Sequence, residues 1–91
     1  MPTVRVPSVL RKHTDGAAKL EADGGTVGEV LRALAAAHPG LEEQLFDGEK
    51  VRGFINVYVD DEDIRYVSGL ATPVQPDSEV ALMPAVAGGA A

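Results

Sequence analysis

Side chains that could carry out acid–base, nucleophilic or metal chemistry are few in this chain of 91 residues. The two imidazoles, His13 and His38, stand far apart and form neither the HxxxH nor the HExxH spacing that gathers a metal ion on a helix. Cysteine is absent, which excludes disulfides, thiolate zinc sites, iron–sulfur clusters and a cysteine nucleophile. We therefore predict no catalytic and no metal-binding residue, and we place His38 at a helix end and His13 in solvent.

Other polar patterns also fall short of a site. The serines lack the context of a nucleophile elbow, and Gly24-Gly25 is too short for a phosphate-binding loop. The acidic run from Asp60 to Asp63 offers hard oxygen ligands, but it lacks the alternating spacing and the glycine of a calcium loop. We interpret this run as a solvated hairpin turn.

The segment after Pro84 could support another kind of chemistry. It contains only small, uncharged residues through Ala91. One interpretation is a frayed chain end. The other is a thin tail that enters a partner's channel, because its first five residues span roughly 17 Å at about 3.3 Å per residue. Gly88 and Gly89 lack a Cβ, so a partner can approach their backbone closely and a terminal glycine carboxylate is little shielded.

Composition limits the classes of protein that need consideration. Hydrophobic residues make up 45% of the chain, and 8 Lys and Arg stand against 14 Asp and Glu, which gives a formal net charge of −6. Nucleic-acid binding is not expected without a basic stripe. No apolar stretch approaches the ~18 residues of a membrane span, and no signal peptide is recognisable, so we predict a cytoplasmic protein. Partners should present basic surfaces through electrostatic steering, partly toward the acidic turn.

Hydrophobic periodicity predicts the strands and the helix of the domain that would carry the tail. Strand patterns cover 3–10, 17–22, 55–59 and 79–83. A turn at Asp15-Gly16 should join the first two strands as a hairpin, and a polar loop is expected at 47–50. A helix should begin after Thr26, which forms a capping box with Glu29, and end before Pro39. One more helical turn is expected over 41–46. Mixed strands around one main helix predict an α+β roll, with a domain over 1–84 and a flexible tail over 85–91.

Three segments carry a resemblance to a known family over nearly the full length. They are 80–89 (VALMPAVAGG), 54–65 (FINVYVDDEDIR) and 6–11 (VPSVLR). The chain resembles the ubiquitin-like sulfur carriers of the ThiS and MoaD group, most closely the CysO-type carriers of cysteine biosynthesis. The resemblance implies a β-grasp fold in which the Gly89 carboxylate is adenylated and then becomes a thiocarboxylate. It further implies that Val86, Ala87 and Gly88 lie in a partner's channel.

The same resemblance implies a set of partners and no activity of the chain's own. An adenylating enzyme would use ATP and Mg²⁺, which the carrier itself does not bind, and a sulfur donor would displace AMP. A cysteine-synthase-like or other biosynthetic enzyme would accept the sulfur, with thiamine, molybdopterin and thiosugar pathways as alternatives to cysteine. The chain departs from the family by continuing past Gly89 with Ala90 and Ala91, which tie up the reactive carboxylate in a peptide bond. We therefore predict that a JAMM-type metalloprotease cleaves between Gly89 and Ala90.

Partner enzymes must also dock on the folded domain. Candidate anchors are Phe54, Tyr58, Leu70 and Met83, each of which could instead be ordinary packing. Tyr58 and Phe54 fall on the strand face opposite the β-branched residues, and Met83 falls on the face opposite Leu82. Two other functions stay open on the sequence alone. The tail could form isopeptide bonds to lysines, as in a ubiquitin-like modifier, or the domain could be a non-catalytic interaction module.

Overall fold

The computed structural model describes residues 1–48, 50–51 and 55–84. Its elements in chain order are β1 (Thr3–Arg5), the 3₁₀ helix η1 (Ser8–His13), β2 (Lys19–Glu21), α1 (Val27–Ala37), α2 (Pro39–Leu45), β3 (Phe46–Asp47), β4 (Lys50–Val51), β5 (Ile55–Val59), β6 (Glu62–Asp63), the 3₁₀ helices η2 (Ile64–Tyr66) and η3 (Gly69–Ala71), and β7 (Glu79–Pro84). The helix over 27–37, the extra helical turn and the strand over 55–59 are where the sequence predicts them.

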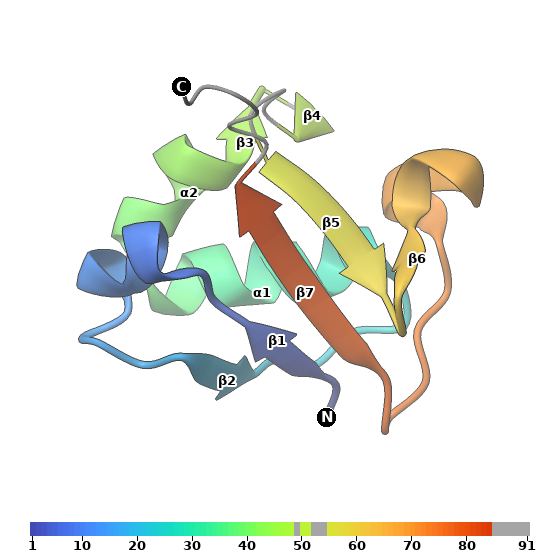
Figure 1. Cartoon of the computed structure of the whole chain (residues 1–91), viewed down its shortest axis with the longest axis horizontal. Coiled ribbons are helices and arrows are strands. Elements are labelled where there is room, and N and C mark those ends of the chain that lie inside the picture. The colour runs from blue at the N-terminus through green and yellow to red at the C-terminus, as the bar shows by residue number, and fades with distance from the viewer. Residues whose placement is uncertain (49, 52–54, 85–91) are drawn as a thin grey trace.

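A five-stranded mixed sheet in the order β2-β1-β7-β5-β6 forms one layer, and the helices cover one of its faces (Figure 1). The first and last strands, β1 and β7, lie parallel at the centre, and all other neighbours are antiparallel. This arrangement places β7 in the middle of the sheet, where residues 79–81 pair with β1 on one side and residues 80–84 pair with β5 on the other. The predicted mixed sheet around one main helix is therefore confirmed.

The core lies between the sheet and α1. Alternation along β5 and β7 sends Val57 and its partner Leu82 to the helical side, where both are 2% exposed. Leu31 and Leu34 on α1 meet them from the other side of this core, as the 3.6-residue period requires. Because each fully buried aliphatic side chain contributes about 1.5–3 kcal/mol, this layer fixes the register of β7.

The start of α1 is held by the predicted capping residues. Thr26 Oγ1 accepts a hydrogen bond from Glu29 N at 3.3 Å, and Glu29 Oε1 accepts one from Gly25 N at 2.8 Å. In the usual capping box the glutamate side chain accepts from the backbone N–H of the N-cap residue, which here is Thr26. In this chain it accepts from the preceding residue, Gly25. Val27 N donates to Thr72 O at 2.9 Å, which attaches the helix start to the loop before β7.

A two-residue turn joins β5 to β6 and fixes the start of β7. Asp60 and Asp61 have φ values of 49° and 74°, as a type I′ hairpin turn requires, and aspartate tolerates this left-handed region better than most residues. Asp60 N donates to Glu79 O at 2.9 Å, and Asp60 Oδ1 accepts from Glu79 N at 3.0 Å. Asp60 and Asp61 therefore form a hairpin turn, as predicted, whereas Glu62 and Asp63 of the same acidic run form β6. The Asp60 carboxylate has a structural partner in the backbone of β7.

Four local expectations need correction. The strand predicted over 3–10 ends at Arg5, because Pro7 has no N–H for the ladder and its carbonyl accepts from Leu10 N at 2.9 Å to open η1. The strand predicted over 17–22 is only Lys19–Glu21. The polar loop over 47–50 lies within a small β3–β4 hairpin. His13 is not solvated: its Nε2 is buried without a hydrogen-bond partner among the described residues.

Candidate docking face and tail exit

The face of the sheet away from α1 brings together two of the four predicted anchors. In the β5–β7 register Tyr58 lies opposite Ala81, and Asn56 lies opposite Met83, so all four share the outer face. Tyr58 and Met83 are diagonal neighbours on this face, within the reach of side chains of this size. Met83 is 50% exposed and Tyr58 is half-buried. Their predicted orientation, opposite the core residues, is confirmed, while a docking role stays a prediction.

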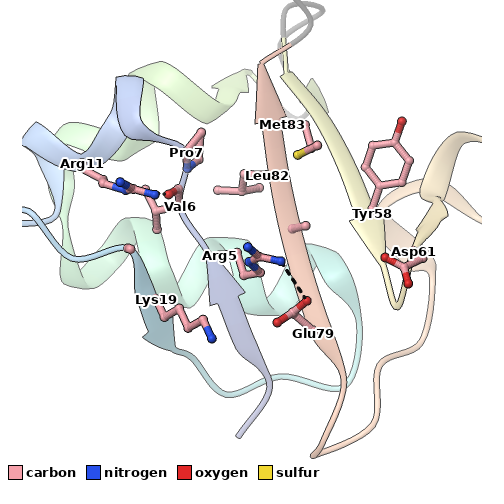
Figure 2. Close-up of a pocket in the computed structure, with 12 residues that line it drawn as sticks. Arg5, Val6, Pro7, Arg11, Lys19, Tyr58, Asp61, Glu79, Leu82 and Met83 are labelled. Atoms are coloured by element: carbon pink, nitrogen blue, oxygen red, sulfur yellow. Dashed lines mark hydrogen bonds and ion pairs between the residues drawn. The ribbon is translucent and has the colours of Figure 1, made fainter.

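These side chains belong to a shallow groove of about 530 Å³ over the outer face. The groove is lined by Arg5, Val6, Pro7, Arg11, Ala18, Lys19, Tyr58, Asp61, Glu79, Ala81, Leu82 and Met83. Figure 2 shows Arg5, Arg11 and Lys19 on the β1–β2 side of β7, with Tyr58 and Asp61 on the β5 side. The groove therefore has an apolar floor, a cationic side and an acidic corner.

Two of the groove's arginines are held by local contacts. Arg11 Nε donates to Val6 O at 3.1 Å, which fixes the guanidinium beside the end of β1. Arg5 Nη1 lies 3.7 Å from Glu79 Oε1, and the Arg5 and Glu79 side chains are 58% and 43% exposed. An ion pair this exposed is worth little, about 0–1 kcal/mol, because water and salt screen it. Both contacts position the charges without removing them from solvent.

The groove adjoins the last described residues of β7. Strand β7 runs to Pro84, which pairs with Ile55 at the start of β5, and Met83 precedes it on the outer face. The predicted tail residues Val86, Ala87, Gly88, Gly89, Ala90 and Ala91, and the predicted anchor Phe54, lie outside the described residues. A partner that received the tail would consequently meet Met83 and its neighbours first.

Leu70 is not brought to this face. It lies on η3, is partly buried and packs against the core. A Cβ built at Gly28 of α1 would lie 3.1 Å from Leu70 O and 3.3 Å from Leu70 Cβ, so the absence of a side chain at Gly28 lets η3 sit on the helix. Leu70 thus contacts the helical layer, away from Tyr58 and Met83.

The cationic side of the groove was missed by sequence reasoning. A signal was present, because Arg5 stands between the core residues Val4 and Val6 and must face outward if β1 alternates. The predicted pairing of the first two strands as a hairpin is confirmed, but the sequence did not supply its register, which sets Arg5 directly opposite Lys19. The position of Arg11 depends on η1, where a strand was expected.

A separate charged contact lies on η2. Asp63 caps this turn by accepting from Arg65 N at 2.9 Å, and its Oδ2 lies 2.7 Å from Arg65 Nη2. Hydrogen bonds from the Arg65 side chain, and then from its backbone, lower the pKa of Asp63 below its ordinary value of 3.8. The same contact raises the pKa of Arg65. Of the acidic run, Asp60 and Asp63 are thus engaged internally, and Asp61 lines the groove.

Among residues 1–48, 50–51 and 55–84, no group of three or more His, Asp or Glu side chains could hold a metal ion. In the same part of the chain, no helix has the length and apolar character needed to cross a membrane.

Comparisons with known proteins agree with this geometry. A relative from Mycobacterium tuberculosis, "Sulfur carrier protein CysO", is 43% identical over 90 residues, which cover 96% of this chain and 97% of that protein. A chain in the crystal structure of the Amycolatopsis orientalis BexX/CysO complex superimposes with a TM-score of 0.91 at 43% identity, covering 98% of this chain and all of that one. "Small archaeal modifier protein 3" of Haloferax volcanii is 36% identical over 67 residues, 74% of this chain and 73% of that protein.

The fold defines the class first: these matches confirm the predicted ubiquitin-like β-grasp domain. Residues 4–89 match the ThiS family, and with the CysO identity above this means that the chain belongs to the ThiS family. The CysO relative is a sulfur carrier protein, which confirms the prediction that this chain is not an enzyme. The matched range ends at Gly89 and leaves out Ala90 and Ala91.

Proposed function

We propose that this chain is a sulfur carrier whose Gly89 carboxylate becomes a thiocarboxylate and donates sulfur, with cysteine biosynthesis as the pathway. The single observation that carries the proposal is the family match, which runs to Gly89 and covers nearly the whole chain. The identity to CysO supports the choice of cysteine over thiamine, molybdopterin or a thiosugar as the destination.

The proposed chemistry proceeds in two steps on a partner enzyme. The Gly89 carboxylate attacks the α-phosphorus of ATP, which is bound with Mg²⁺, so that an acyl adenylate forms and pyrophosphate leaves. A sulfide-level donor then attacks the carbonyl carbon; the C–S bond forms, the C–O bond to AMP breaks, and AMP departs with the electron pair. Activation is needed because a resonance-stabilised carboxylate is a poor electrophile without a good leaving group. ATP and Mg²⁺ belong to the partner in this scheme.

The structural contribution of this chain is presentation. Strand β7 is paired with β1 over residues 79–81 and with β5 over residues 80–84, and its last described residues lie beside the groove. A tail without bulky side chains can enter a narrow channel, while the groove gives the partner a surface to hold. The crystal structure of CysO with BexX supports the expectation of a protein partner. We propose an adenylating enzyme and a sulfur-accepting, cysteine-synthase-like enzyme as the two principal partners.

Activation requires a free carboxylate at Gly89. In the full chain this carbonyl is in the peptide bond to Ala90, so we propose that hydrolysis by a JAMM-type metalloprotease precedes adenylation. The family match that stops at Gly89 supports this position of the cut.

The test is ATP–pyrophosphate exchange catalysed by an adenylating enzyme in the presence of the chain ending at Gly89. We expect this chain to stimulate exchange above the level of the enzyme alone. A chain ending at Ala87 is the matched control, since it keeps the whole described domain and a terminal carboxylate but lacks the two glycines. Equal stimulation by both chains would contradict the proposal, and so would stimulation by neither.

A second function is favoured by one specific relative. The 36% identity to small archaeal modifier protein 3 supports a ubiquitin-like modifier that forms isopeptide bonds to lysines. The same acyl adenylate would serve, with a lysine amine in place of sulfide as the attacking group. Mass-resolved detection of carrier attached to lysine in the source organism, without any thiocarboxylate form, would favour this second function over sulfur transfer.

A further inference from the structure

The register of the first two strands places two positive side chains directly against each other. Arg5 on β1 and Lys19 on β2 are Cα partners in an antiparallel pair, and both point to the outer face. Like charges directly opposite each other across strands destabilise a sheet. The chain has a net charge of −6, so two cations paired in this way do not serve the stability of the domain. We therefore ask which partner they could bind.

Arg11 is the third cationic residue of the groove, and it adds to the positive potential around Arg5 and Lys19. Arg11 is turned toward the end of β1 by its hydrogen bond to Val6 O. Over residues 1–48, 50–51 and 55–84, neither Arg11 nor Lys19 has a carboxylate within 4.0 Å, and Arg5 has only the long contact to Glu79. The β1–β2 side of the groove is therefore a cationic patch, defined by Arg5, Arg11 and Lys19, whose one ion pair among the described residues is the exposed contact of Arg5 with Glu79.

The remaining lining residues specify what else the occupant must carry. The floor between the cationic patch and Tyr58 is apolar, formed by Val6, Pro7, Ala81 and Met83 among others. Asp61 stands on the opposite side, beyond β7 (Figure 2). A segment that fits this groove has apolar side chains over β7 and carboxylates over the β1–β2 side, and it carries no carboxylate near Asp61.

We propose that the cationic patch is a specificity site for the activating enzyme, and that it receives an acidic segment of that enzyme flanked by apolar side chains. The proposal rests on the proposed function and names the chemistry of its first partner. Carboxylates of the bound segment would relieve the repulsion between Arg5 and Lys19. The complex is thus stabilised by a charge interaction that is absent from the free domain. The patch lies on the same groove as Met83, which brings the docked enzyme close to the exit of the tail.

The test is steady-state adenylation of the chain ending at Gly89 by its activating enzyme at low ionic strength. Lys19→Glu and Arg11→Glu should each raise the KM for the carrier about ten-fold, as loss of a hot-spot contact does, with kcat unchanged. Lys12→Glu is the matched control, because Lys12 is exposed on η1 beside Arg11, lies outside the groove lining, and gives the same change in charge. It should change KM less than about two-fold.

The thermal stability of the free carrier separates recognition from folding. Lys19→Glu places a carboxylate opposite Arg5 and should raise the Tm of the free domain while weakening the complex. High salt should shrink the KM difference between Lys19→Glu and the parent chain, since screening acts on exposed charges. An equal KM effect from Lys12→Glu, or none from Lys19→Glu and Arg11→Glu, would overturn the proposal while adenylation of the parent chain still upholds the carrier function. If the parent chain is not adenylated at all, the carrier function fails and this inference falls with it.

Discussion

The ring of His13 occupies the space that a side chain at position 40 would need. A Cβ built at Gly40 would lie 2.8 Å from His13 Nδ1, which is well inside van der Waals contact, and 3.5 Å from His13 Cγ. This close approach lets the end of η1 pack against the first turn of α2. It also explains why His13 is half-buried and carries a buried Nε2 with no described hydrogen-bond partner.

Gly40→Ala should therefore destabilise the domain by about 1–3 kcal/mol, as overpacking does, despite the better helix propensity of alanine. Urea unfolding of the single variant measures this cost. In a His13→Ala background the clash is removed, so the same substitution should become neutral or stabilising. An equal cost in both backgrounds would show that the two residues are not coupled.

A second stability prediction concerns the start of α1. Thr26→Ala removes the acceptor for Glu29 N and should cost about 1 kcal/mol, the usual effect of losing an N-cap side chain. Thr26→Ser keeps the hydroxyl and is the matched control, and it should not weaken the cap because serine is at least as good an N-cap residue as threonine. Chemical denaturation of the three chains compares them, and an unchanged midpoint for Thr26→Ala would contradict the role of the cap.

The contact between Asp63 and Arg65 predicts a pH dependence. The pKa of Asp63 is lowered in the folded state, chiefly by the Arg65 side chain, so folding favours its ionised form. Its contribution to stability is complete above the ordinary pKa of 3.8 and is lost as the pH falls through the lower folded pKa. Asp63→Asn should thus destabilise the domain at neutral pH and cease to do so in strong acid. A cost that does not change with pH would contradict this assignment.

The exposed thioether of Met83 gives a test of the docking face. Met83→Ser should leave the free energy of unfolding within about 0.5 kcal/mol, because the side chain is half-exposed on the outer face. It should raise the KM of the activating enzyme for the carrier at least about five-fold if Met83 is an anchor. Val9→Ser is the control, since Val9 is 58% exposed and does not line the groove. Equal effects of the two substitutions on KM would argue against the groove.

The elements with strong local signals are the ones that sequence predicts best. Helix α1 has an apolar stripe, a cap at Thr26 and a stop at Pro39, and β5 alternates over its whole length, so both follow from periodicity and capping alone. The segment over residues 8–10 is predicted as strand because it contains Val9 and Leu10. It forms a 3₁₀ turn instead because Pro7 ends the ladder and the tertiary packing of Leu10 decides the conformation.

Some parts of the candidate site follow from local sequence patterns, and others depend on pairing between distant segments. The outward orientation of Tyr58 and Met83 follows from alternation within single strands. The cationic patch does not, because Arg5 and Lys19 meet only through the register of β1 with β2, and Arg11 is placed by η1. The position of Leu70 depends on the packing of η3 against Gly28, which no local pattern encodes. The role of the tail residues is predicted from the sequence and from the family, because these residues lie outside the described part of the chain.

The most direct test of the carrier function is the intact mass of two chains, one full-length and one ending at Gly89. Each is incubated with the activating enzyme, ATP, Mg²⁺ and a sulfide source. The chain ending at Gly89 should gain the mass difference between sulfur and oxygen, as one carboxylate oxygen is replaced, and the full-length chain should keep its mass. Addition of one carboxamidomethyl group by iodoacetamide would confirm a thiocarboxylate, because this chain has no cysteine thiol to react instead. No gain in the chain ending at Gly89 would contradict the carrier function, and an equal gain in the full-length chain would contradict the requirement for removal of Ala90 and Ala91.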